Sequence, residues 1–127
     1  MTAYILDAGA LVAVDRGDRR LVTRLRAATL DGVVLRTNPL AIAQAWRHGD
    51  GRQARLALLL RGADVVPVGE QHGRAIGELL GSTGTRDIVD ASLVLLAQPG
   101  DVVVTSDVDD LQPLAEARGS RVTFLAC

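Results

Sequence analysis

Lysine is absent from this chain of 127 residues, and all 14 basic residues are arginines. The absence excludes phosphate sites that depend on a lysine, such as the P-loop of nucleotide-binding enzymes. The net charge of −1 gives no overall basic signal for nucleic acid. Aromatic residues are scarce as well, with one Tyr, one Trp and one Phe, which disfavours a binder of single strands that works by stacking bases.

Cysteine occurs once, as Cys127, so no disulfide within the chain can form. This usage is typical of a reducing compartment, and we expect a cytoplasmic protein. No apolar run approaches the roughly 18 residues that a membrane span needs, and no basic segment precedes an apolar one at the N-terminus. We therefore expect no membrane association and no signal peptide. The length fits a single domain over residues 1–127.

Short β-branched runs alternate with helical patterns along the whole chain. The predicted strands are residues 3–6, 33–35, 65–68, 102–104 and 122–125, and the predicted helices are 8–14, 18–28, 39–46, 53–60, 70–80, 86–96 and 108–117. This alternation predicts an α/β fold of three layers, α/β/α, around a mostly parallel sheet of four or five strands.

Two of the predicted strands are followed by an aspartate. Asp7 comes directly after the first strand, and Asp107 comes two polar residues after the strand at 102–104. Asp7 and Asp107 are expected at the carboxyl edge of the sheet, where open α/β sheets bind ligands. Asp87 and Asp90, three residues apart on one helix, share a face, and Asp110 follows in the last helix. Carboxylates gathered in one cleft repel one another, and Mg²⁺ or Mn²⁺ would relieve that repulsion. Such a site, without His or Cys ligands, favours phosphodiester chemistry.

Helix capping is the alternative interpretation of the same aspartates, and spacing alone leaves it open. Asp7 and Asp107 could cap the helices that follow them, and Asp110 stands where a capping box has its second residue. Asp87 could favour the dipole of its helix. Asp90 is harder to explain in this way, because it lies within the most apolar helix of the chain.

Three segments together resemble the motifs of the PIN domain family, and in particular the VapC-type toxins of bacterial toxin–antitoxin pairs. They are residues 5–11 (Ile-Leu-Asp-Ala-Gly-Ala-Leu), 90–93 (Asp-Ala-Ser-Leu) and 104–107 (Val-Thr-Ser-Asp). None of these motifs is specific alone, but their order and spacing match over almost the whole chain. The resemblance implies an endoribonuclease that depends on Mg²⁺ or Mn²⁺ and takes RNA as its substrate. It also implies a homodimer and a cognate antitoxin that inserts into the active cleft.

The same resemblance assigns roles to individual residues. It implies that Asp7, Asp90 and Asp107 are the catalytic metal ligands, with Asp87 and Asp110 at positions where further acids often occur. Gln44 stands where the family usually has a glutamate, and its neutral carbonyl oxygen should bind a metal more weakly.

Two other functions remain as alternatives to the nuclease. Because of Gln44, the chain could be a catalytically weak PIN-like binding or regulatory module. A phosphatase of the haloacid-dehalogenase type would need a second aspartate two residues after Asp7, where the sequence has Gly9.

Overall fold

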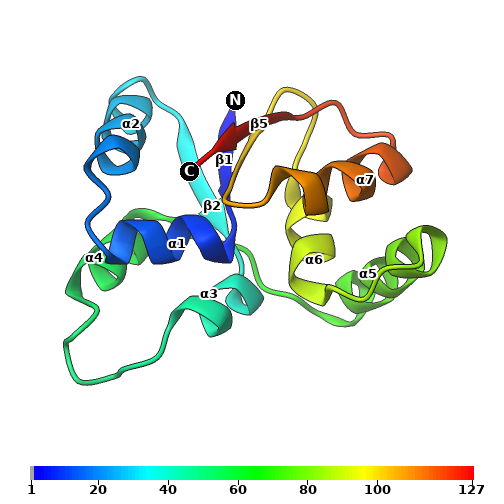
Figure 1. Cartoon of the computed structure of the whole chain (residues 1–127), viewed down its shortest axis with the longest axis horizontal. Helices are drawn as coiled ribbons and strands as arrows, with labels where there is room; N and C mark the ends of the chain where they lie inside the picture. The colour runs from blue at the N-terminus through cyan, green and yellow to red at the C-terminus, as the bar shows by residue number, and fades with distance from the viewer. Residues whose placement is uncertain (1) are drawn as a thin grey trace.

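The computed structural model describes residues 2–127 and has a five-stranded sheet at its centre (Figure 1). The strands are β1 (Ala3–Leu6), β2 (Val34–Thr37), β3 (Asp64–Val65), β4 (Val102–Thr105) and β5 (Thr123–Ala126). Their order in the sheet is β3-β2-β1-β4-β5, and every neighbouring pair is parallel. The predicted α/β class is confirmed, with a sheet that is wholly rather than mostly parallel.

Helices cover both faces of the sheet. They are α1 (Ala8–Asp15), α2 (Arg19–Leu30), α3 (Pro39–Ala45), α4 (Ala54–Gly62), α5 (Glu70–Thr83), α6 (Ile88–Leu96) and α7 (Val108–Arg118). In Figure 1, α1 to α4 lie on one side of the strands and α5 to α7 on the other, and each group packs within itself. The three predicted layers are therefore present. Within the described residues, no helix combines the length and the apolar character needed to cross a bilayer.

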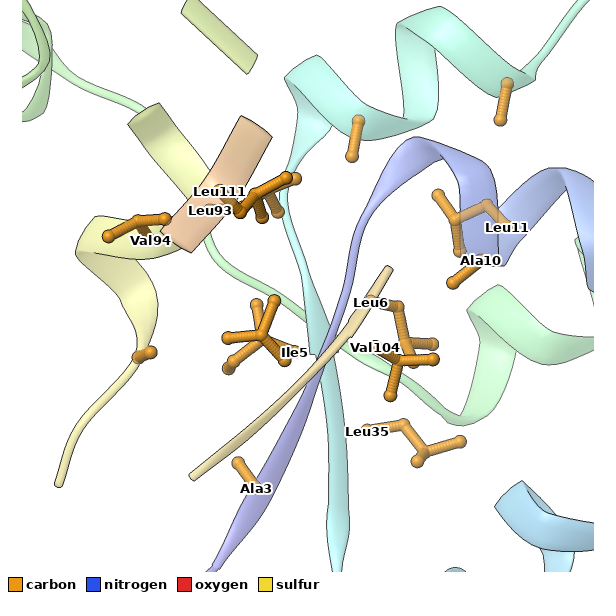
Figure 2. Packing of buried hydrophobic residues seen from close by; sticks show 14 of the residues in the cluster. Ala3, Ile5, Leu6, Ala10, Leu11, Leu35, Leu93, Val94, Val104 and Leu111 are labelled. Carbon is orange, nitrogen blue, oxygen red and sulfur yellow. The ribbon is translucent and has the colours of Figure 1, made fainter. Parts of the chain in front are cut away.

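The strands are buried on both faces, as their uninterrupted apolar runs predict. Side chains alternate along β1, so that Ile5 and Leu6 point to opposite layers (Figure 2). Ile5 packs on the side of Leu93 from α6, whereas Leu6 lies on the side of Leu11 from α1, and all four side chains are fully buried. The central strands are thereby fixed in register against both helical layers.

Polar side chains cap four helices by accepting a hydrogen bond from a backbone N–H three residues further on. These caps are Asp7 on α1, Asp18 on α2, Asn38 on α3 and Asp87 on α6. Thr85 directly precedes the predicted helix at 86–96 and is the residue that this range predicts as its N-cap, but its hydroxyl bonds instead to that of Thr83, at 2.8 Å. Asp87 takes its place, and α6 begins two residues later than expected.

The predicted end of the fifth helix at Gly81 is also wrong. The helix continues to Thr83 and ends at Gly84, whose φ of 70° is left-handed. Hydroxyl groups of Ser82 and Thr83 donate to the carbonyl of Leu79, at 2.9 and 3.1 Å, within this last turn. A glycine ends a helix where the chain needs a positive φ, and in this chain that position is Gly84.

The third strand is shorter than predicted. In place of residues 65–68, β3 is limited to Asp64–Val65, since Pro67 has no N–H to offer a sheet. It lies at the edge, as the proline predicts, and Asp64 accepts a hydrogen bond of 2.7 Å from Arg36 on β2.

Asp101 anchors the amino end of β1 to the segment before β4. Its side chain is only 2% exposed, and its two oxygens accept from the N–H groups of Ala3, at 2.9 Å, and Gln98, at 2.8 Å.

We expect Asp101→Ala to lower the free energy of unfolding by about 2–4 kcal/mol, because two buried donors lose their partner. Urea denaturation measures this. The control Asp31→Ala, at an exposed aspartate, should change stability by less than about 0.5 kcal/mol, and equal effects at the two sites would contradict the assignment.

Candidate active site

The chain reverses direction across the sheet between β1 and β4. From β1 it proceeds to β2 and β3 on one side, and it then returns to β4 and β5 on the other. In open parallel sheets, the crevice that binds ligands lies at the carboxyl ends of the strands beside such a reversal. Asp7 directly follows β1 at this edge, and Asp107 follows β4 after one intervening residue. The sequence therefore places its first and last motif aspartates at the reversal.

Asp7 is 4% exposed and caps the helix that follows it, which is one of the two roles that the sequence left open. Its Oδ1 accepts a hydrogen bond of 2.7 Å from the N–H of Ala10 and so caps α1. Burial raises the pKa of Asp7, while hydrogen bonds from the Thr105 side chain and from the N–H groups of Ala10, Ser106 and Gly9 oppose that rise. The capping interpretation is thus correct for this residue, and the same carboxylate also acts on Asp90.

Asp90 is the aspartate within residues 2–127 whose pKa is shifted most. Burial raises its pKa to about 7, together with the negative charges of Asp87 and Asp7, a hydrogen bond with the Asp87 side chain, and the charge of Asp110. The effect of Asp7 means that the first turn of α6 lies near the end of β1. The connection before α6 therefore folds back over the carboxyl edge, as an acidic cleft requires.

Asp107 and Asp110 form a second pair at the start of α7. Asp107 stands at the N-cap position but makes no capping hydrogen bond with its side chain. A hydrogen bond that the protonated Asp110 carboxyl group donates to the Asp107 carboxylate, followed by the negative charge of Asp107, raises the pKa of Asp110. The capping-box interpretation of Asp110 is wrong, because its carboxyl group pairs with that of Asp107 and leaves the helix end uncapped. Asp87 is a true cap, since its Oδ1 accepts from the N–H of Asp90 at 2.9 Å.

Gln44 forms no hydrogen bond with the aspartates within residues 2–127. It is exposed in the last turn of α3, and it makes none of the side-chain hydrogen bonds found within residues 2–127. The structure supplies no contact that joins it to the aspartates.

The donor chemistry of the aspartates fits Mg²⁺ or Mn²⁺, since carboxylate oxygens are the ligands that both ions prefer. Over residues 2–127, however, no group of three or more His, Cys, Asp or Glu side chains is already arranged to enclose a metal ion. Holding one here requires changes of side-chain rotamer, which the partly or fully exposed Asp90, Asp107 and Asp110 can make.

Sequence reasoning missed Thr105 and the small size of Gly9. The buried Thr105 hydroxyl accepts from the N–H of Asp107, at 2.8 Å, and also bonds to Asp7. A Cβ atom on Gly9 would overlap the Ser106 hydroxyl, so glycine allows α1 to approach the loop after β4. The feature of the sequence that could have indicated a role for Thr105 is its position as a polar residue at the end of a buried strand.

A groove of about 420 Å³ opens beside Gly9 and Ser106 and is also lined by Cys127. Burial, together with the negative charges of Asp7 and Asp18, raises the pKa of the Cys127 thiol to about 11. The thiol is therefore protonated near neutral pH, which makes it a poor nucleophile.

A larger groove, of about 820 Å³, lies away from the aspartates between α2 and α4. Apolar side chains dominate its lining, including the exposed Leu30 and Leu58. Its only charged lining residues are Arg19, Arg26 and Arg55. Exposed apolar surface of this kind is typical of a protein-interaction site.

No protein-family model matches the chain, and none of the curated proteins matches its sequence. Among solved structures, it is similar to a chain in the crystal structure of VapBC2 from Rickettsia felis bound to a DNA fragment from their promoter. The TM-score is 0.70, with 98% of this chain and 99% of that chain covered and 14% of the sequence identical. The likeness confirms the three-layer PIN-like fold, and it confirms the VapC-type resemblance at the level of the fold.

The charge on Asp90 should make stability depend on pH. Its pKa is about 7 in the folded chain against 3.8 as the ordinary value, so folding takes up a proton between these limits. Without divalent cations, stability should therefore fall as the pH rises from about 4 to 7. Asp90→Asn should remove this loss and stabilise the protein at pH 8 by about 1–2 kcal/mol, an amount that allows for screening by water, with little effect at pH 4.

Thermal unfolding in the presence of EDTA at pH 4, 6 and 8 measures the effect. The control Asp31→Asn, at an exposed aspartate, should follow the wild type at all three values. If the thermal stability of Asp90→Asn depends on pH as that of the wild type does, the inference that negative charge is crowded around Asp90 is wrong.

Proposed function

We propose that this protein is an endoribonuclease that depends on Mg²⁺ or Mn²⁺ and acts as the toxin of a VapBC-type toxin–antitoxin pair. The observation that carries the proposal is the placement of Asp7 and Asp107 at the carboxyl edge of the sheet, beside the reversal between β1 and β4. Asp90 lies close enough to this edge that the charges of Asp7, Asp87 and Asp110 add to the effect of burial in raising its pKa to about 7. Natural sequences rarely gather so much like charge without a cation to neutralise it. The fold, shared with a chain of a VapBC complex, supports the same function.

In this proposal Asp7, Asp90 and Asp107 are the catalytic residues and hold the metal, with Asp87 and Asp110 as further ligands. The bound ion would supply a water of lowered pKa and neutralise charge on the RNA phosphate. Asp7 is held in place by the first turn of α1. Asp90 retains its proton up to about pH 7 while no cation is bound, and it would release that proton on binding one.

We also propose a cognate antitoxin as the protein partner, a homodimer as the free form, and the cytoplasm as the place of action. The neighbour in Rickettsia felis is part of a VapBC complex, which supports the partner. The apolar groove between α2 and α4, whose charged lining residues are all arginines, offers surface to an acidic protein segment.

Replacing one metal-binding aspartate should abolish activity without unfolding the protein. We expect Asp7→Asn and Asp90→Asn each to reduce Mn²⁺-dependent RNA cleavage by more than about a hundredfold, because even partners of metal ligands cost ten- to a hundredfold. The Oδ1 of an asparagine at position 7 can still cap α1, so the thermal midpoint should change little. Cleavage is measured on a labelled RNA pool with matched EDTA samples.

Asp109→Asn is the matched control, since Asp109 is an exposed aspartate in the same turn as Asp110. It should cleave RNA at the rate of the wild type. If both catalytic variants keep their activity, Asp7 and Asp90 have been assigned wrongly.

A PIN-like binding or regulatory module without strong catalysis is the second candidate. Two observations favour it: the neutral Gln44, and the lack of a preformed group of three metal-binding side chains over residues 2–127. Calorimetric titration with Mn²⁺ separates the candidates, because a module would bind no metal at millimolar concentration.

If Gln44 does weaken a metal site, Gln44→Glu should tighten Mn²⁺ binding by about tenfold through its added charge. An unchanged affinity would place position 44 outside the site.

A further inference from the structure

Thr37 and Asn38 are consecutive polar residues at the carboxyl end of β2, and both are 0% exposed. Neither carries charge, and neither belongs to the set of aspartates. Burial of such side chains is costly unless every polar atom finds a partner. Each of the two reaches a different segment that carries a site aspartate.

Thr37 holds the end of β1. The register of β1 and β2 pairs Ile5 with Arg36, the last paired positions of these strands. The Thr37 side chain extends this connection by donating its hydroxyl proton to the carbonyl of Leu6, at 2.8 Å. Leu6 directly precedes Asp7. The hydroxyl therefore fixes the backbone from which the Asp7 carboxylate projects.

Asn38 holds the first turns of α6. Its Oδ1 accepts from the N–H of Ala41, at 3.0 Å, and caps α3, while its Nδ2 donates to the hydroxyl of Ser92, at 2.9 Å. Ser92 is 4% exposed, and its hydroxyl donates in turn to the carbonyl of Val89, at 2.6 Å. These two α6 residues flank the turn that carries Asp90.

The cap on α3 does not explain why this residue is an asparagine. Serine or aspartate caps a helix about as well, because capping needs one acceptor oxygen. The Nδ2 group is the additional feature of asparagine, and in this fold it serves the contact with α6. Within residues 2–127, no buried side-chain nitrogen or oxygen lacks a hydrogen-bond partner, so the bridge is complete.

We propose that the side chains of Thr37, Asn38 and Ser92 form a polar clamp that sets the spacing between the carboxylates of Asp7 and Asp90. The proposal rests on the function proposed above and adds positioning residues to its site. Thr37 ends β2 and Asn38 caps α3, two elements that carry no site aspartate, and Ser92 receives the contact on α6, the helix that carries Asp90.

The test is the affinity for Mn²⁺, measured by calorimetry on the full chain, together with cleavage of RNA. Thr37→Val keeps the shape of the side chain but removes the donor to Leu6, and Ser92→Ala removes the acceptor for Asn38. We expect each change to weaken Mn²⁺ binding by about tenfold or more, because groups that orient metal ligands contribute on that scale. Thr37→Ser, which keeps the hydroxyl, should restore most of the affinity.

Two further variants separate positioning from stability. Asn38→Ser keeps a cap for α3 but cannot reach Ser92, so it should lower the Mn²⁺ affinity as Ser92→Ala does. The double variant Asn38→Ser/Ser92→Ala should bind Mn²⁺ almost as tightly as either single variant, since both changes break the same contact. Thr29→Val is the matched control: its hydroxyl bonds to the carbonyl of Leu25 within α2, at 2.9 Å, and its loss should leave Mn²⁺ binding unchanged.

The outcomes distinguish the two proposals. If the wild type binds no Mn²⁺ and cleaves no RNA, the proposed function fails. If the wild type binds Mn²⁺ and the folded variants at positions 37, 38 and 92 bind it equally well, the clamp is overturned. The clamp is overturned as well if Thr37→Ser weakens binding as much as Thr37→Val, because the hydroxyl would then not be the cause. Circular dichroism melting checks that each variant is folded, and Asn38→Ser serves if Thr37→Val does not fold.

Discussion

The crowding of carboxyl groups at one edge of the sheet is the constraint on which the candidate site depends. Asp90 experiences the charge of Asp7 from β1, of Asp87 from its own helix and of Asp110 from α7. The opposite ends of α6 and α7 are tied together by Arg118, whose Nη1 donates to the carbonyls of Val94, at 2.5 Å, and Ala97, at 2.6 Å. The two helices are thus fastened at the end that lies away from the aspartates.

The sheet and its two helical layers could be predicted because their signals are local. Uninterrupted β-branched runs mark strands buried on both faces, and Asn38 followed by Pro39 marks the start of α3 in sequence and structure alike. The errors fell where two local signals competed. Gly81 and Gly84 both qualify as the end of α5, and Thr85 and Asp87 both qualify as the cap of α6, and only the surrounding chain decides between them.

The aspartates of the candidate site could be named from the sequence because a residue that follows a parallel strand lies at the carboxyl edge of the sheet. Their supports could not be named in this way. The bond from Thr37 to Leu6 and that from Asn38 to Ser92 join residues far apart in the chain, and nothing near Asn38 in sequence distinguishes a simple cap from a bridge. The interaction of Asp107 with Asp110 was hidden as well, because their spacing is also that of a capping box.

The close approach of Gly9 to Ser106 has a consequence for how the chain can vary. A Cβ atom at position 9 would lie 2.0 Å from the Ser106 hydroxyl oxygen and 2.9 Å from the Ser106 Cβ atom, so a side chain there requires residue 106 to lose its own side chain or its loop to shift. These two residues come from opposite ends of the sequence, yet they form one steric unit at the mouth of the cleft. A methyl group gained at the first position would have to be matched by a loss at the second or a shift of its loop, and the two positions are therefore expected to change together during evolution.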